Sequence, residues 1–270
     1  MRYSVVIPAY NALRKLPRAI ESCLRQSLPP AEILVVDDAS PELPADGLRS
    51  LYPAEFATGL LRVIALAKNA GPSTARNTGW EAATGDRIAF LDADDRWDAD
   101  RLATIAEWLD AEPETDWFAH RYRLPGEPRA GPVNCCEKPI PLSLKRLILG
   151  NVAQTSCVVL RASIPLRFDE RMRHCEDYDL WLRIAASGYR TLFSETAFTE
   201  LDRPQLTAGG LSGDRRAMRR GEMRAYRHLA HLRPALRPAL PLLYAFSIAK
   251  HARRALIWRG RGFSKNENVT

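Results

Sequence analysis

Three carboxylates, those of Asp92, Asp94 and Asp95, stand within four residues of one another. They follow an apolar run at 88–91, a pattern typical of a buried parallel strand that delivers acidic side chains to its carboxyl end. Because such close carboxylates repel one another, a hard divalent cation with oxygen ligands would suit them. A solvated acidic turn before a helix that begins near Asp98 explains the same residues equally well.

A second group of carboxylates, Glu176, Asp177 and Asp179, lies in the stretch HCEDYDLWLRIAASG. Apolar residues follow them at helical spacing, so we expect a helix that ends at Gly188 and carries the three acids in its first turn. Carboxylates there complement the positive end of the helix dipole, which is a sufficient structural explanation. The functional alternative is that one of them acts as a general base.

Short apolar runs alternate with helical patterns from the first residues onward. This alternation predicts an α/β fold with a Rossmann-like, mostly parallel and doubly wound sheet flanked by helices. Between 113 and 153 the pattern is poor, and we expect an irregular connection with one helix at 142–149. The expected strands lie at 3–7, 32–36, 61–66, 88–91 and 156–160, and other helices are expected before residue 28 and at 72–83.

Four strand ends then converge on one crevice, where open α/β sheets bind their ligands. The crevice would gather Tyr10, Asp38, Arg76 and Asp94. An aromatic ring, a carboxylate that accepts from a base N–H, and a basic group beside a metal-binding acid suit a nucleoside diphosphate. No GxGxxG motif follows the first strand, which disfavours a dinucleotide-binding domain. Each residue also has an ordinary alternative, as a core aromatic, a turn carboxylate or a helix surface charge.

Hydrophobic residues make up 46% of the 270 residues, an ordinary share for a globular protein. No stretch approaches the roughly 18 apolar residues of a membrane span, and the first apolar run is too short for a signal peptide. We therefore expect a cytoplasmic protein, either soluble or peripheral at the inner face of the cell membrane. The five cysteines match no zinc spacing and are expected to be reduced. The weaker alternative is a zinc site that uses His120, Cys135, Cys136, His174 and Cys175.

The net charge of +7 belongs to the last part of the chain. Residues 207–270 contain 14 Lys and Arg against 3 Asp and Glu, whereas residues 1–206 contain 25 against 29. The slight acidity of 1–206 argues against nucleic-acid binding. We expect a main domain over 1–206 and a basic helical extension over 207–270. The extension would rest on an anionic membrane, on the main domain, or on a second copy of the chain in a homodimer.

The chain resembles the family-2 glycosyltransferases, the large group of inverting enzymes with the GT-A fold. The resemblance covers about residues 1–205 and rests on the order and spacing of five segments, since any one of them alone is weak. It implies transfer of a sugar from a nucleotide-sugar donor to a hydroxyl of a glycan or lipid-linked acceptor, commonly in surface polysaccharide synthesis. The five segments are SVVIPAYNA, ILVVDDAS, KNAGPSTARNTG, FLDADDRW and FDERMRHCEDYDLWLRIA.

For the donor, the resemblance implies that Pro8, Tyr10 and Asp38 hold the base and ribose and that Arg76 lies near them. A carboxylate at position 38 suits uracil, so a UDP-sugar is the expected donor. Thymine and guanine also offer N–H groups to such a carboxylate, and the base stays open at this point.

For catalysis, the resemblance implies that Asp92 and Asp94 form the metal-binding motif, with Asp94 the direct ligand of Mn²⁺ or Mg²⁺. Asp177 matches the catalytic base, which deprotonates the acceptor hydroxyl during a single inverting displacement. The chain departs from many members of the family because FTELDRPQLTAGGLS, after the last strand, has no metal-binding histidine. Asp202 would replace that histidine, or Asp94 and the donor phosphates would hold the metal without it.

Two other classes of protein fit parts of the sequence. A response-regulator receiver domain would use ILVVDD and FLDADD as acidic strand ends, but it leaves residues 1–31 and the segments ARNTG and EDYDLWL without a role. A nucleotide-sugar binding protein without turnover fits every segment. Retained binding together with loss of metal-dependent transfer would distinguish that protein from an enzyme.

Overall fold

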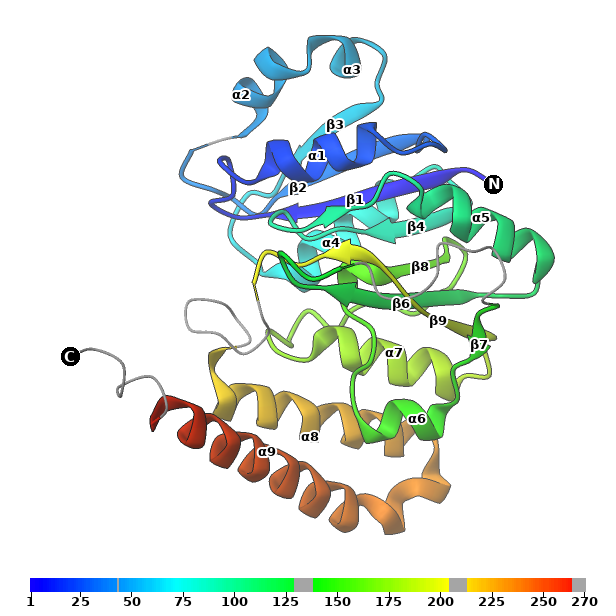
Figure 1. Ribbon diagram of the computed structural model, residues 1–270, viewed down its shortest axis with the longest axis vertical. Helices are drawn as coiled ribbons and strands as arrows, with labels where there is room; N and C mark the ends of the chain where they lie inside the picture. The colour runs from blue at the N-terminus through cyan, green and yellow to red at the C-terminus, as the bar shows by residue number, and fades with distance from the viewer. Residues whose placement is uncertain (43, 129–137, 204–212, 264–270) are drawn as a thin grey trace.

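The computed structural model describes residues 1–42, 44–128, 138–203 and 213–263 of the chain. Within these ranges the strands form one sheet with helices packed against it (Figure 1). The strands are β1 (Tyr3–Ala9), β2 (Glu32–Asp37), β3 (Leu61–Ala65), β4 (Arg87–Phe90), β5 (Arg96–Trp97), β6 (Trp117–Arg123), β7 (Ile140–Pro141), β8 (Val158–Arg161) and β9 (Thr191–Glu200). The helices are α1 (Leu16–Leu24), α2 (Pro44–Leu51), α3 (Pro53–Ala57), α4 (Pro72–Ala82), α5 (Arg101–Ala111), α6 (Leu144–Leu149), α7 (Glu176–Ala186), α8 (Arg215–Leu232) and α9 (Leu240–Phe263), with 3₁₀ turns η1 (Thr155–Cys157) and η3 (Pro234–Ala239).

The strand order is β3-β2-β1-β4-β8-β6-β9-β5, with β7 paired to β9. The first four strands are mutually parallel. Strand β1 pairs in parallel with β2 on one side and with β4 on the other, and β2 pairs in parallel with β3. Alternate residues of β1 enter two different cores. Val5 and Ile7 pack with α1 and α5, while Val6 packs with α4 on the other face. Both faces of β1, β2 and β4 are covered, which is why most residues of these three strands are apolar.

The doubly wound pattern stops after β4. The next strand in the sheet, β8, runs antiparallel to both β4 and β6, and the short strands β5 and β7 run antiparallel to β9. The expected mostly parallel sheet is confirmed, with these three strands as its antiparallel part. The region 113–153 is also more regular than expected, because it contains β6 and the short β7. The sequence of β6, WFAHRYR, gives a weak strand signal, because the polar residues His120, Arg121 and Arg123 interrupt its apolar run.

Helix α4 approaches the sheet closely at Gly79. A Cβ atom at this position would lie 2.4 Å from Cγ1 of Val6 and 3.1 Å from Cγ2 of Val36, so any larger residue would push the helix away. The helix begins at Pro72, directly after Gly71, whose φ of 94° suits glycine. The predicted helix at 72–83 is therefore confirmed, and it packs against β1 and β2.

The last helices pack in sequence, α8 against α7 and α9 against α8 (Figure 1). Ala225, Tyr226 and Leu229 of α8 are completely buried and share a core with Trp181 of α7. The predicted boundary between 206 and 207 lies outside the described residues. None of the helices in the described ranges is both long enough and apolar enough to cross a membrane.

Candidate active site

The carboxyl ends of β1 and β2 place three of the predicted donor residues at one edge of the sheet. Ala9 pairs with Asp37 in the parallel register, and the Asp38 amide donates to the Ala9 carbonyl at 2.8 Å. Pro8 is partly buried inside β1, whereas the Tyr10 residue just after it is 51% exposed. Tyr10 is thus no core residue, and its ring can contact a ligand.

Asp38 is buried and binds the loop that precedes α4. Its two carboxylate oxygens accept hydrogen bonds from the backbone amides of Ala70 at 2.7 Å and Gly71 at 2.8 Å. The position of α4 therefore depends on Asp38, a structural role that sequence reasoning missed. Because a carboxylate has about four lone-pair sites, Asp38 can accept a further hydrogen bond from a ligand.

Arg76 connects the two acidic groups of the sequence. Its side chain, only 6% exposed, donates from Nη2 to Oδ1 of Asp92 at 2.8 Å and from Nη1 to Oε1 of Glu176 at 2.9 Å. Burial alone would lower the pKa of Arg76, but the nearby carboxylates of Asp92 and Glu176 outweigh that effect and raise it. Arg76 is therefore an interior ion-pair partner that holds the end of β4 against the start of α7.

Asp94, like Asp92, is a partly exposed carboxylate of the first acidic group. Its Oδ2 lies 3.5 Å from Nζ of Lys15 and 3.6 Å from Nη2 of Arg203, both longer than a good charge-assisted hydrogen bond. Lys15 makes its shorter contact, 2.8 Å, with Asp202. Burial, followed by the negative charge of Asp92, raises the pKa of Asp94, so a cation at this position would be stabilising.

Asp95 belongs to the interior of the same turn. It accepts from Oγ of Ser156 at 2.6 Å and from the backbone amide of Asp202 at 3.1 Å, and thereby joins the turn to η1 and the end of β9. Burial and then the charge of Asp92 raise its pKa to about 8. Over the described ranges, no three His, Cys, Asp or Glu side chains form a ready-made metal-binding group. The oxygen donors of Asp94 and Asp92 fit a hard divalent cation if a ligand supplies the others.

Asp177 lies in the first turn of α7, as the sequence predicted, and is partly exposed. Its Oδ2 accepts from the side-chain amide of Asn151 at 2.8 Å, and its Oδ1 accepts from the backbone amide of Tyr178 at 2.7 Å. Burial and then the charge of Glu176 raise the pKa of Asp177 to about 7. Glu176 and Asp177 therefore differ, because Glu176 is bound to Arg76 while Asp177, among the described residues, accepts from two neutral donors.

Asn151, Ser156 and Lys15 support the site, but sequence reasoning gave none of them a role. Asn151 stands just after α6 in a stretch without periodicity, so no pattern in the sequence marks it. It is held in place from α7, because Oη of Tyr178 donates to the Leu147 carbonyl near the end of α6 at 2.7 Å. Only the folded chain brings these distant segments together.

The parallel strands with carboxylates at their ends and the antiparallel β8 beside them define a GT-A type of α/β fold. The sequence also matches the family model described as Glycosyl transferase family 2 over residues 4–154, more than half of the chain. The chain belongs to that family, as the sequence motifs predicted.

Two relatives illustrate the range of the family. The chain is 30% identical over 208 residues to the amylovoran biosynthesis glycosyltransferase AmsB of Erwinia amylovora, covering 70% of this chain and 65% of that protein. It is 32% identical over 207 residues to the succinoglycan biosynthesis protein ExoU of Rhizobium meliloti, covering 69% of this chain and 57% of that protein. The chain thus spans less than two thirds of the length of either relative.

Solved structures agree with the fold. The chain superimposes on residues 1–349 of TarS from S. aureus with a TM-score of 0.65 and 20% identity, covering 100% of this chain and 76% of that one. The mannosyltransferase PcManGT from Pyrobaculum calidifontis, solved with GDP-Man and Mn²⁺, gives a TM-score of 0.64 at 19% identity, covering 98% and 81%. At these identities the likeness concerns the fold alone.

Proposed function

We propose that this protein is an inverting glycosyltransferase that moves a sugar from a nucleotide-sugar donor to a hydroxyl of a glycan or lipid-linked acceptor. The observation that carries the proposal is the double ion pair of Arg76. By binding both Asp92 and Glu176, Arg76 brings the acidic strand end beside the helix that carries Asp177. Donor activation and proton removal would then take place in one crevice.

The donor is proposed to be a UDP-sugar. Tyr10, Pro8 and Asp38 stand together at the ends of β1 and β2, where an exposed ring can stack on a base and a carboxylate can accept from its N–H. TarS, which shares the fold, has been solved with UDP and with UDP-GlcNAc. PcManGT was solved with GDP-Man, so the same fold also accepts guanine and the base must be measured.

Asp94 and Asp92 are proposed to bind a divalent cation, Mn²⁺ or Mg²⁺, together with the donor phosphates. The raised pKa of Asp94 and its long contacts to Lys15 and Arg203 support this assignment, since its charge is only loosely compensated. When bound, such a cation acts as a Lewis acid that stabilises the leaving diphosphate. The Mn²⁺ in PcManGT is consistent with this proposal.

Asp177 is proposed to be the general base. A pKa of about 7 suits proton transfer near neutral pH, and partial exposure gives an acceptor hydroxyl access to the carboxylate. The Asn151 amide would orient the carboxylate through its 2.8 Å hydrogen bond. With the proton removed as the hydroxyl attacks, the sugar carbon is inverted in one displacement and no covalent intermediate forms.

Polysaccharide assembly at the inner face of the cell membrane is the proposed setting. Relatives of this chain are named for amylovoran, succinoglycan and teichuronic acid biosynthesis. Residues 1–206 would form the catalytic domain and residues 207–270 an extension that supports it. A nucleotide-sugar binding protein without turnover remains the alternative, and a transfer assay separates the two.

A calorimetric screen of UDP, GDP and dTDP tests the proposal, each with Mn²⁺ and with a chelator. UDP should bind most tightly, and Mn²⁺ should strengthen binding to the wild type but not to Asp94→Ala. Asp46→Ala, which removes an exposed aspartate from α2, should behave like the wild type. Equal affinity in chelator and in Mn²⁺ for the wild type would contradict the metal assignment. Release of UDP from a UDP-sugar with an acceptor then distinguishes an enzyme from a binder.

A further inference from the structure

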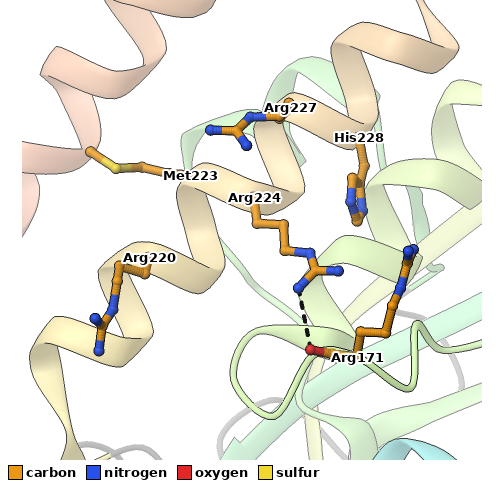
Figure 2. A pocket seen from close by; sticks show the side chains of 6 residues that line it. All are labelled: Arg171, Arg220, Met223, Arg224, Arg227 and His228. Carbon is orange, nitrogen blue, oxygen red and sulfur yellow. Dashed lines mark hydrogen bonds between the residues drawn. The ribbon is translucent and has the colours of Figure 1, made fainter.

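A basic cavity lies between α8 and the segment that leads into α7, on a part of the molecule with no role in the proposed donor site. Its volume is about 510 Å³. Figure 2 shows that α8 and the loop before α7 both contribute side chains to it. The lining residues are Arg171, Arg220, Met223, Arg224, Arg227 and His228.

The cavity concentrates positive charge with little to balance it. Arg220, Arg224 and Arg227 lie on one face of α8, and like charges at such spacings destabilise a helix by about 0.2–0.5 kcal/mol per pair. One carboxylate, Asp169, accepts from Arg224 at 3.1 Å and from Arg171 at 2.9 Å. In the part of the chain that the structure describes, the salt bridges include none from Arg220 or Arg227.

Two other acids near the cavity already have partners. Asp214 caps α8 by accepting from the backbone amides of Arg216 and Ala217, and these bonds, followed by nearby positive charges that include Arg220, lower its pKa. Oδ1 of Asp179 lies 2.8 Å from Nδ1 of His228, and its Oδ2 accepts from Arg183 at 2.8 Å. Asp179 is completely buried, so its charge is directed into the protein. Arg220 and Arg227 are exposed and form no salt bridge within the described residues, so their guanidinium groups can donate to a ligand.

The cavity borders the chain segment that carries the proposed base. At Gly221, in α8, a Cβ atom would lie only 2.4 Å from the His174 carbonyl oxygen, so the helix touches the backbone just before α7. Arg224 also donates to the Arg171 carbonyl at 3.2 Å, the contact drawn in Figure 2. A molecule held here would lie beside the approach to α7.

We propose that this cavity binds a negatively charged group, phosphate or carboxylate, carried on the sugar chain of the acceptor. Guanidinium groups bind such oxyanions through paired N–H donors, and four arginines line this cavity. The volume is within the range of small-ligand sites, about 300–1,000 Å³. Among the described residues that line the cavity there is no Phe, Tyr or Trp side chain on which a nucleotide base would stack, and the imidazole of His228 is held by Asp179. The assignment rests on the proposed function, because it names the class of acceptor.

Such a site would explain selection of an acidic saccharide over a neutral one. Binding energy from a charged group away from the reacting hydroxyl would hold the acceptor in place beside the base, which is how remote contacts raise the rate of transfer. Loss of the cavity arginines should then weaken acceptor binding without affecting the donor.

Calorimetry with glucose 6-phosphate as the probe tests the site, with glucose and inorganic phosphate measured separately. The protein is first saturated with UDP and Mn²⁺ so that the donor site is filled. Glucose 6-phosphate should bind more tightly than either glucose or phosphate alone. Arg220→Gln and Arg227→Gln should each weaken binding about fivefold or more, since each removes a hydrogen bond to a charged group. Arg237→Gln, which removes an exposed arginine outside the cavity, is the matched control and should leave binding unchanged.

Unchanged affinity in both cavity variants, or no binding of glucose 6-phosphate at millimolar concentration, would overturn the proposal. Equal binding of phosphate alone would reduce the site to a simple anion site and remove the acceptor assignment. UDP affinity is recorded for every variant. Failure of UDP to bind counts against the proposed function, whereas loss of probe binding alone concerns only the cavity.

Discussion

Glu176 and Asp177 are adjacent in the sequence, yet their environments assign them different chemistry. Glu176 accepts from the buried Arg76 and is held as a charged partner. Within the described ranges, Asp177 accepts from the Asn151 side chain and a backbone amide, and its pKa is raised to about 7. A group that must take a proton at neutral pH needs the second environment, not the first.

Asp177→Asn is expected to lower the rate of transfer about a hundredfold or more, because the amide keeps the shape of the side chain but cannot take a proton. UDP affinity should be unchanged, since the asparagine leaves the donor residues untouched. Initial rates and UDP calorimetry measure the two effects. Glu176→Gln is the comparison, and if it lowers the rate at equal stability while Asp177→Asn does not, the base is Glu176.

The pH dependence of transfer should follow the ionisation of Asp177. The rate should rise as pH increases through about 7, because only the carboxylate can accept a proton. Asn151→Ala removes a hydrogen bond that lowers this pKa, so the rise should shift to higher pH. Rates of wild type and variant from pH 5 to about 9 measure the shift.

As pH rises, the contribution of Asp177 to the free energy of unfolding should fall while the rate of transfer increases. The pKa of Asp177 is higher in the folded protein than the ordinary value of 3.8, so the folded state binds the proton more tightly. The contribution of this residue to stability therefore decreases as pH rises from about 4 to 7.

The pH profile of the rate also has a contradicting outcome. If the rate rises at the same pH in the wild type and in Asn151→Ala, the titrating group is not Asp177.

At the scale of helices and strands, the sequence predicted most elements because their signals are local. The helix at 72–83 has Pro72 at its start and the one at 142–149 has Ser143 as its cap, and both form as α4 and α6. The direction of β8 could not be predicted, since the same apolar run suits a parallel or an antiparallel strand. The contacts of Asp38 with the amides of Ala70 and Gly71 also depend on tertiary structure.

Helix α9 is attached to α8 through a buried acid. Glu222 of α8 accepts from Oγ of Ser247 at 2.9 Å, forms an ion pair with Lys250, and lies 3.0 Å from Nε2 of His251. Burial would raise the pKa of Glu222, but the partners from α9, Lys250 first among them, lower it. The stabilising charge is therefore present above about pH 4.5 and is lost as the pH falls through the lower pKa of the folded state.

Glu222→Gln is expected to destabilise the protein by about 2 kcal/mol or more, because it leaves Lys250 of α9 without its partner in the interior. Urea unfolding at pH 7 measures the change. The matched control is Glu107→Gln, which alters an exposed glutamate on α5 and should change stability very little. Equal stabilities of the two variants would mean that α9 is held by its apolar contacts alone.

At the scale of the whole molecule, the extension has two different sides. Its inner side packs on α7 through Tyr226, whose hydroxyl donates to the Ile148 carbonyl at 2.8 Å and so supports the end of α6 before Asn151. Its outer side, on α9 at the edge of the molecule in Figure 1, exposes apolar residues to solvent. Leu242 is 74% exposed, Ile248 46% and Phe246 39%.

The exposed face of α9 is expected to bind an anionic membrane surface. Burial of a large apolar side chain contributes about 1.5–3 kcal/mol, and each cation near an anionic leaflet adds about 1 kcal/mol. The last 64 residues have a net charge of +11. Burial of apolar side chains and electrostatic attraction would therefore both favour binding to an anionic membrane. Binding should weaken as salt rises, because the electrostatic part is screened within about 10 Å at 0.1 M salt.

Co-sedimentation with vesicles measures this binding. The wild type should pellet with anionic vesicles at low salt and stay in solution with neutral ones. The double variant Leu242→Gln, Phe246→Gln should bind at least about tenfold more weakly, because it removes two exposed apolar side chains. Leu51→Gln, at a residue that is 60% exposed on α2, is the control and should bind like the wild type. A different result would assign the exposed face of α9 to contact between two copies of the chain. In that case the wild type would not pellet with anionic vesicles, and analytical ultracentrifugation would show a dimer for the wild type and a monomer for the double variant.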